Sequence, residues 1–190
     1  MKTTQIICIH EGVDNSVDRK FAQAFLKQYK PSWVRPGKNN KGWQFESCGD
    51  NTNLLKQFPR YLDLCSRRGG HTTLVVLGDL DHSHKNGDEL KEKYWKAANA
   101  ADIKREYFDQ VIFIFPKDRI ENWIEYINMG HTNEEIEGPR VSIEEARKAG
   151  KALAVRCKSS QALQNIPLSL AWSCNNWQQL VRRMREGEQN

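Results

Sequence analysis

Three carboxylates follow two apolar runs directly, and their positions suggest metal chemistry. Glu11 comes after the run Gln5–His10, and Asp79 and Asp81 come after the run Thr72–Leu77. Residues two apart in an extended chain point the same way, so we expect Asp79 and Asp81 to reach one point. Converging carboxylates repel one another unless some take up protons or a cation neutralises them. Because Mg²⁺ and Mn²⁺ prefer hard oxygen ligands, these three residues predict a site for Mg²⁺ (or Mn²⁺).

Other acidic residues near these positions have competing interpretations. Asp14 and Asp18, shortly after Glu11, are weaker candidates for the same site. Asp18 is as well suited to capping the helix that follows it as to contacting a metal. For the aspartate pair itself, the alternative is that Asp79 caps a turn and Asp81 is a solvated loop residue.

The elements that must position these carboxylates alternate along the chain. Apolar and β-branched runs predict strands, and apolar residues at helical spacing predict helices. The strands are expected at residues 5–10, 43–48, 72–77 and 111–115. Helical spacing is found near 21–29, 53–66, 89–101, 120–127, 142–156 and 168–185. This alternation predicts an α/β fold with a mostly parallel four-stranded sheet flanked by helices, and functional groups in such sheets gather beyond the carboxyl ends of the strands.

Three details of this pattern are specific enough to check. Pro59 lies inside the second helical pattern and predicts a kink there or a break into two helices. Ser142 and Glu145 have the spacing of a capping box at a helix start. We expect residues 1–127 to form the metal-binding domain and residues 128–190 a C-terminal helical extension packed on the same domain.

Composition limits the class of protein. A length of 190 residues suits one α/β domain with an extension, and the net charge of +5 fits either polyanion binding or a surface of mixed charge. The five cysteines are odd in number and include no CxxC pair, which argues against zinc ligation and a disulfide framework; Cys8 is expected in the core. Neither a membrane span nor a signal-peptide core is recognisable, so we expect a cytoplasmic protein with no membrane partner.

Taken together, several of these motifs resemble the Toprim domain, a fold shared by topoisomerases, bacterial primases and OLD-type nucleases. The resemblance rests on the strand followed by Glu11-Gly12, a helix start at Asp18-x-x-Phe21, Gly49 after the second strand, and a strand followed by Gly78-Asp79-Leu80-Asp81. It covers about residues 5–120. The later sequence from Phe115 to Trp123 is similar to small stand-alone Toprim-like proteins of bacteria and phage defence.

The resemblance implies a function and a set of site residues. Glu11, Asp79 and Asp81 would bind one or two Mg²⁺ ions for phosphoryl transfer, with Glu121 as a further acid and Lys151 or Lys158 as a downstream lysine. The chain has His82-Ser83-His84-Lys85 where topoisomerases continue with Arg-Glu-Gly, and it has no room for a tyrosine-bearing or zinc module. The nuclease branch is therefore favoured, with nucleic acid as the substrate. The alternatives are a non-catalytic nucleotide- or partner-binding subunit, a different metal enzyme such as a nucleotide-sugar transferase, and an accessory subunit of a defence assembly, which would act with a partner protein.

Residues around this site could assist in binding and proton transfer. Four basic residues are candidates for nucleic-acid contacts, and they are Arg35, Lys38, Lys85 and Lys117. Two arginine pairs, Arg67-Arg68 and Arg182-Arg183, could also grip phosphates, although cations are favourable at helix ends anyway. His82 and His84 could relay protons, but we favour exposed loop histidines without a role. Of the six tryptophans, Trp33 and Trp43 are the better candidates for base stacking, whereas Trp123 and Trp177 are expected in the core.

Overall fold

The computed structural model describes residues 5–28, 43–68, 72–81, 83–158 and 164–186. The strands are β1 (Gln5–His10), β2 (Trp43–Ser47), β3 (Thr72–Leu77) and β4 (Ile112–Ile114). The helices in these residues are α1 (Val17–Gln28), α2 (Asn51–Arg68), α3 (Gly87–Ala100), α4 (Arg105–Phe108), α5 (Ile120–Met129), α6 (Ile143–Lys158) and α7 (Leu168–Glu186). The sequence pattern did not reveal the four-residue helix α4.

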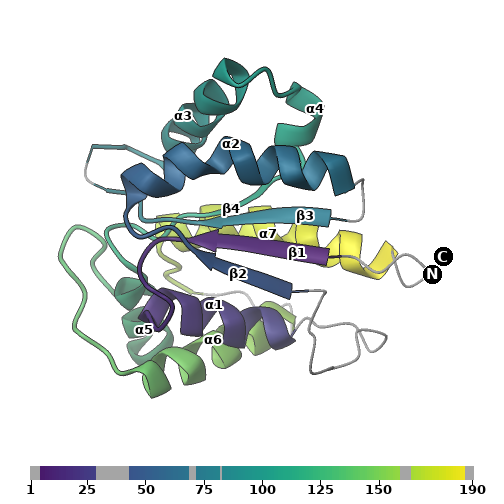
Figure 1. Cartoon of the computed structure of the whole chain (residues 1–190). Helices are drawn as coiled ribbons and strands as arrows, with labels where there is room; N and C mark the ends of the chain where they lie inside the picture. Colours follow the sequence, from purple (N-terminus) through teal and green to yellow (C-terminus); the bar gives the residue numbers. More distant parts are fainter. Residues whose placement is uncertain (1–4, 29–42, 69–71, 82, 159–163, 187–190) are drawn as a thin grey trace.

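The four strands form one sheet in the order β2-β1-β3-β4, and every pairing is parallel. The α/β class and the parallel sheet are thus confirmed, with no antiparallel strand among the described residues. Because the strands run the same way, the loops that follow them all meet at one edge of the sheet (Figure 1). The register places His10 beside Leu77 and Leu77 beside Ile114, so the chain segments after β1, β3 and β4 start at the same level.

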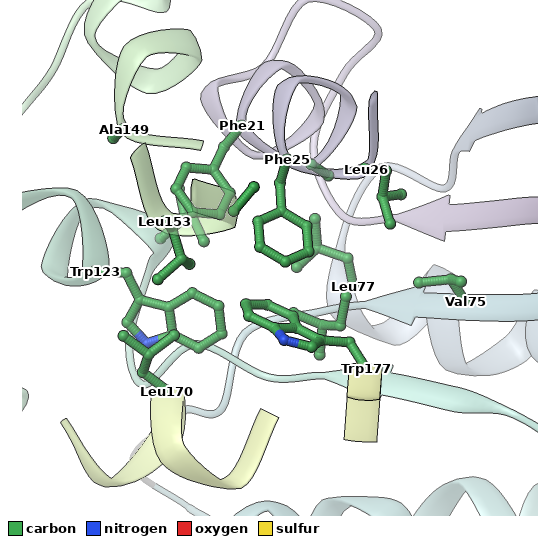
Figure 2. Packing of buried hydrophobic residues seen from close by; sticks show 14 of the residues in the cluster. Phe21, Phe25, Leu26, Val75, Leu77, Trp123, Ala149, Leu153, Leu170 and Trp177 are labelled. Carbon is green, nitrogen blue, oxygen red and sulfur yellow. The ribbon is translucent and has the colours of Figure 1, made fainter. Parts of the chain in front are cut away.

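Alternate residues of the strands face two separate hydrophobic layers, as expected for a sheet buried on both faces. Cys8, Val75 and Leu77 point toward α1, α5, α6 and α7, whereas Ile9 and Val76 point toward α2, α3 and α4. Figure 2 shows the first layer, where the Trp177 ring lies near Phe25, with ring centroids 4.0 Å apart. Trp123 and Trp177 are core residues, as predicted, and so is Cys8.

Helix α2 passes through Pro59 without interruption, so of the two predicted outcomes the break into two helices is wrong, and the kink stays a prediction. Proline removes one backbone hydrogen bond and crowds the preceding turn, which disfavours a helix in isolation. Here Leu54, Phe58 and Leu62 are buried against the sheet on one face of the helix, and this packing outweighs the local cost. Tertiary burial therefore decides the conformation of this segment.

The start of α6 matches its sequence signature. Ser142 N–H donates to a Glu145 carboxylate oxygen at 2.7 Å, and Glu145 N–H donates to Ser142 Oγ at 3.2 Å. This reciprocal pair is the predicted capping box. The helix then packs closely along α1, where an added Cβ at Gly150 would lie 2.5 Å from the Phe21 carbonyl oxygen.

Helix α7 packs against β4, an edge strand of the sheet, with hydroxyl groups as well as apolar side chains. Ser173 Oγ accepts a hydrogen bond from Phe115 N–H at 3.0 Å, and Ser169 Oγ accepts one from Lys117 N–H at 3.1 Å. These donors belong to the segment directly after β4, which has no further strand beside it. Two serines one helical turn apart therefore satisfy backbone groups that an edge strand would otherwise leave unpaired.

Replacing Ser173 by alanine should lower the free energy of unfolding by about 1–3 kcal/mol, because a buried Phe115 N–H loses its acceptor. Urea unfolding followed by circular dichroism measures this. Thr52→Ala, at an exposed position of α2, is the control and should change stability by less than about 0.5 kcal/mol. Equal stability of Ser173→Ala and wild type would show that the hydroxyl contributes nothing.

Helices α6 and α7 share the hydrophobic layer of α1 and α5. The boundary predicted after residue 127 falls within α5, and the division into 1–127 and 128–190 stays a prediction. In the described part of the chain, none of the helices has the length and apolar character needed to cross a lipid bilayer.

Candidate metal centre at the carboxyl edge of the sheet

The loop after β1 places Glu11 at the centre of this edge. Glu11 N–H donates to the Leu77 carbonyl at 3.1 Å, which ties the loop to β3. The following Gly12 has φ +83° and pairs with Gly49, which has φ +84°, through a hydrogen bond of 2.6 Å. Glycine adopts this backbone region without steric cost, so the two residues let the loops after β1 and β2 turn sharply together.

The Glu11 carboxylate faces the loop after β3. Its Oε2 accepts a hydrogen bond from Asp79 N–H at 3.3 Å, and the carboxylate also accepts one from Asn51 N–H at the first residue of α2. The Asn51 side chain in turn donates to the Asp79 carbonyl at 3.1 Å. Burial nevertheless raises the pKa of Glu11 more than these hydrogen bonds lower it. Glu11 and the backbone of Asp79 thus belong to one connected site.

Close packing of α2 against this loop depends on Gly78. A Cβ added there would lie 2.9 Å from Cδ2 of Leu54 on α2. The missing side chain lets the start of α2 approach the loop that carries Asp79, and this approach brings Asn51 within hydrogen-bonding distance. The glycine before the aspartate therefore has a packing role.

The carboxyl group of Asp79 lies among other acids. Its pKa is raised well above the usual range, first by burial and then by the negative charges of Asp18, Glu11 and Glu121. Burial and the charges of Glu121 and Glu11 likewise raise the pKa of Asp18 to about 7. Burial raises the pKa of Glu121 too. The structure therefore brings Glu11 and Asp79 together with two residues that were weaker candidates, Asp18 and Glu121; we call these four residues the carboxylate cluster.

Asp18 joins the cluster because it does not cap α1. Ser16 Oγ accepts the hydrogen bond from Arg19 N–H at 3.2 Å, so Ser16 is the capping residue, and Asp18 lies within the first turn of the helix. Glu121 occupies the equivalent place in the first turn of α5. Two helix starts thus add carboxylates to those at the strand ends.

Asp81 points elsewhere. Its Oδ1 accepts hydrogen bonds from Ser83 N–H at 2.8 Å, from Ser83 Oγ, and from the ring of His84 at 2.8 Å. Partial burial opposes ionisation of this carboxyl, but the hydrogen bonds from Ser83 and His84 outweigh it and lower the pKa of Asp81. The side chain is 53% exposed, and its negative charge reaches Glu11, whose pKa it raises. Asp81 therefore lies at the rim of the cluster, with Oδ1 engaged by Ser83 and His84.

The remaining acidic candidate, Asp14, is turned toward solvent. Its side chain is 82% exposed and forms an ion pair with Arg19. That pairing directs it away from the carboxylate cluster.

The predicted basic and aromatic candidates lie in different environments. Lys117, on the loop after β4, pairs through its backbone with Leu80 and through its side chain with Glu135, whereas Lys85 is exposed on the loop before α3. Arg35, Lys38 and Trp33 lie outside the described residues. The partly exposed Trp43 packs against the core, Lys151 is exposed on α6, and the side chain of Lys158 is not among those described.

One of the two loop histidines differs from expectation. His84 is 4% exposed, so the interpretation of an exposed loop histidine is wrong for it. The hydrogen bond to Asp81 and the packing of the loop before α3 hold the ring inside the protein. His82 lies outside the described residues.

The donor set fits a hard divalent cation. Glu11 and Glu121 raise the pKa of Asp18, and all three raise that of Asp79, so a cation bound among them would remove both the repulsion and part of the cost of burying charge. Among the described residues, no three or more His, Cys, Asp or Glu side chains already stand in an arrangement that could hold a metal ion. The fit therefore rests on the chemistry of the donors and on their shared position at the carboxyl edge.

Some residues of this site carry no recognisable sequence signal. His10 is fully buried, and its Nδ1 is 2.7 Å from the Glu11 carbonyl oxygen, which holds the backbone at Glu11. Asn51 orients the Asp79 loop, and Arg119 lies close enough for its charge to lower the pKa of Asp18 and Glu121. Only Arg119 could have been noticed, because it follows β4 in the same loop as Lys117 and precedes Glu121 by two residues.

Compared with known proteins, the chain matches no protein-family model, no curated protein and no solved structure.

Proposed function

We propose that this protein is a Mg²⁺- or Mn²⁺-dependent phosphoryl-transfer enzyme of Toprim-like organisation, and specifically a nuclease that cleaves phosphodiester bonds in DNA or RNA. The observation that carries the proposal is the carboxylate cluster of Glu11, Asp18, Asp79 and Glu121 at the carboxyl edge of a parallel sheet. Buried acids that raise one another's pKa are common at functional sites. The order of the Toprim-like motifs adds the phosphoryl-transfer chemistry, and a setting in phage defence rests on that resemblance alone.

The residues have distinct roles in this proposal. Glu11 and Asp79 would hold the ion, with Asp18 and Glu121 as further carboxylates of the cluster and Asp81 at its rim. A bound divalent cation lowers the pKa of a water molecule and neutralises charge that develops on the scissile phosphate. Hydrogen bonds from the backbone N–H groups of Asn51 and Asp79 keep the Glu11 carboxylate in place. Arg119 would supply positive charge to the substrate phosphate, because it lies within electrostatic reach of Asp18 and Glu121, and Lys117 would add to it from the same loop.

A second candidate function is a non-catalytic nucleotide- or partner-binding subunit. The observation on its side is that Oδ1 of Asp81 already accepts three hydrogen bonds. The Asp81 carboxylate, held by these hydrogen bonds, is less available to coordinate an ion than the spacing of Asp79 and Asp81 implies.

Incubation with nucleic acids separates the two functions. Linear, supercoiled and single-stranded DNA and RNA would each be incubated with the purified protein in Mg²⁺, Mn²⁺ or EDTA. We expect cleavage that requires the metal, and a loss of at least about 100-fold in rate in Asp79→Asn, because the ion site is disrupted. The matched control is Asp63→Asn, an exposed aspartate on α2 that pairs with Arg67. Cleavage that Asp79→Asn retains in full would overturn the site, and no cleavage of any substrate would favour the binding subunit.

A further inference from the structure

Two cations on the loop after β4 are paired with an acidic segment from a later part of the chain. Lys117 Nζ lies 3.5 Å from Glu135 Oε1, and a terminal nitrogen of Arg119 lies 2.5 Å from Glu137 Oε1. Both cations belong to the loop between β4 and α5, whereas the two glutamates lie between α5 and α6. We call residues 133–138 the acidic segment.

The acidic segment is fixed to the body of the protein at both ends. At its start, Glu134 accepts hydrogen bonds from the hydroxyl and, at 3.3 Å, from the backbone N–H of Ser169 at the beginning of α7. At its end, Gly138 lies so close to the first turn of α5 that an added Cβ would be 2.5 Å from Asn122 Oδ1. The segment therefore stays beside the cations, and its Glu135 and Glu137 side chains are 74% and 62% exposed.

The cations have the properties that a phosphate site needs. The Lys117 side chain is only 14% exposed, and that of Arg119 is 32% exposed, so both are partly shielded from water. Burial raises the pKa of Asp18 and of Glu121, and the positive charge of Arg119 opposes this by lowering the pKa of each. The Arg119 guanidinium therefore lies within electrostatic reach of the carboxylate cluster. Guanidinium groups bind phosphate oxygens through two parallel hydrogen bonds, and lysine binds them as a point charge.

The two glutamate partners of these cations are weak competitors, whereas Asp118, whose side chain is 20% exposed, keeps a second contact with Arg119 at 3.7 Å from its Nε. An ion pair whose carboxylate is mostly exposed contributes little free energy, because water and salt screen it. A phosphodiester group that also contacts the ion site would displace such a carboxylate. The pairs Lys117–Glu135 and Arg119–Glu137 thus resemble a phosphate site that the protein's own carboxylates fill.

We propose that Lys117 and Arg119 are the phosphate-binding residues of the site, and that Glu135 and Glu137 occupy them as displaceable counterions that compete with the nucleic-acid backbone. The inference rests on the proposed function, since it gives that site its substrate contacts and a built-in restraint on binding. The acidic segment sets how tightly nucleic acid binds, and the carboxylate cluster sets whether it is cleaved.

The test is binding of a short fluorescein-labelled single-stranded DNA, measured by fluorescence anisotropy in EDTA at low ionic strength. Removing both competing charges in Glu135→Gln/Glu137→Gln should tighten binding by about two- to tenfold. The matched control, Glu106→Gln/Glu144→Gln, makes the same change in net charge at glutamates paired with Lys104 and Lys148 elsewhere on the surface. We expect it to change the affinity by less than about twofold, because distant exposed charges are screened.

A charge-removing variant completes the experiment. Lys117→Gln should weaken binding, and in a background with this substitution the Glu135→Gln change should no longer tighten it. The proposal would be overturned if Glu135→Gln/Glu137→Gln changed the affinity no more than the control Glu106→Gln/Glu144→Gln did. It would also be overturned if none of the proteins bound DNA. Because the assay contains no metal, a gain in binding without any cleavage in the Mg²⁺ assay would refute the nuclease function while leaving the phosphate site standing.

Discussion

In metal-free buffer near pH 8, Asp79→Asn should unfold at a higher temperature than the wild-type protein. Asp79 carries a carboxyl that is partly buried beside Asp18, Glu11 and Glu121, and ionising it there costs folding free energy. Asparagine has nearly the same shape, carries no charge and can donate hydrogen bonds to the neighbouring carboxylates. We expect a gain of at least about 1 kcal/mol, which corresponds to roughly 2–4 °C for a chain of this size.

Adding Mg²⁺ or Mn²⁺ should reverse the order of thermal stability, so that wild type unfolds at a higher temperature than Asp79→Asn. A ligand that binds only the folded state raises stability in proportion to its binding free energy, so wild type should gain several degrees at saturating metal. Asp79→Asn should gain little, and Asp63→Asn should follow wild type throughout. Differential scanning calorimetry with and without metal measures all three proteins. A variant Asp79→Asn that is less stable than wild type without metal would contradict the claim that clustered negative charge destabilises this edge.

The second large effect is a fall in the stability of the metal-free protein as the pH rises. The pKa of Asp18 is about 7 in the folded protein, against an ordinary value of 3.8. A folded-state pKa above the unfolded one means that the folded protein holds the proton more tightly. This contribution to stability is fully present below about pH 4 and is lost as the pH rises through about 7; its size is on the order of 4 kcal/mol.

Urea unfolding of wild type and Asp18→Asn between pH 4 and pH 8 isolates this contribution. Other groups titrate in the same range, so the informative quantity is the difference between the two proteins at each pH. Asp18→Asn should become more stable relative to wild type as the pH rises, and Asp63→Asn should show no such trend. A difference that is constant with pH would mean that Asp18 titrates as it does in the unfolded chain.

The sheet was predictable because three of its strands, β1, β3 and β4, are buried on both faces. Continuous apolar runs such as Thr72–Leu77 identify such strands, and their spacing by helices fixes the parallel arrangement. The same reasoning placed Glu11 and Asp79 at one edge. Local propensity failed at Pro59, where packing against the sheet keeps α2 continuous.

The rest of the site depends on features that a sequence pattern does not contain. Whether Asp18 and Glu121 point toward Asp79 depends on how α1 and α5 are rotated against the sheet, and packing sets that rotation. Asp81 has the spacing to point with Asp79, yet Ser83 and the buried His84 hold its Oδ1 at the rim. The acidic segment meets Lys117 and Arg119 only after the chain has passed through α5. Spacing therefore identified the edge, and side-chain packing selected the members of the cluster.

Calorimetric titration of Mn²⁺ into the metal-free protein at pH 8 tests the central claim most directly, because it measures ion binding without any substrate. We expect saturable binding to wild type and to Asp63→Asn, with binding to Asp79→Asn weakened at least about tenfold, because a ligand to the cation is lost. Absence of binding to wild type, or equal affinity in all three proteins, would contradict the assignment of the carboxylate cluster as a metal site.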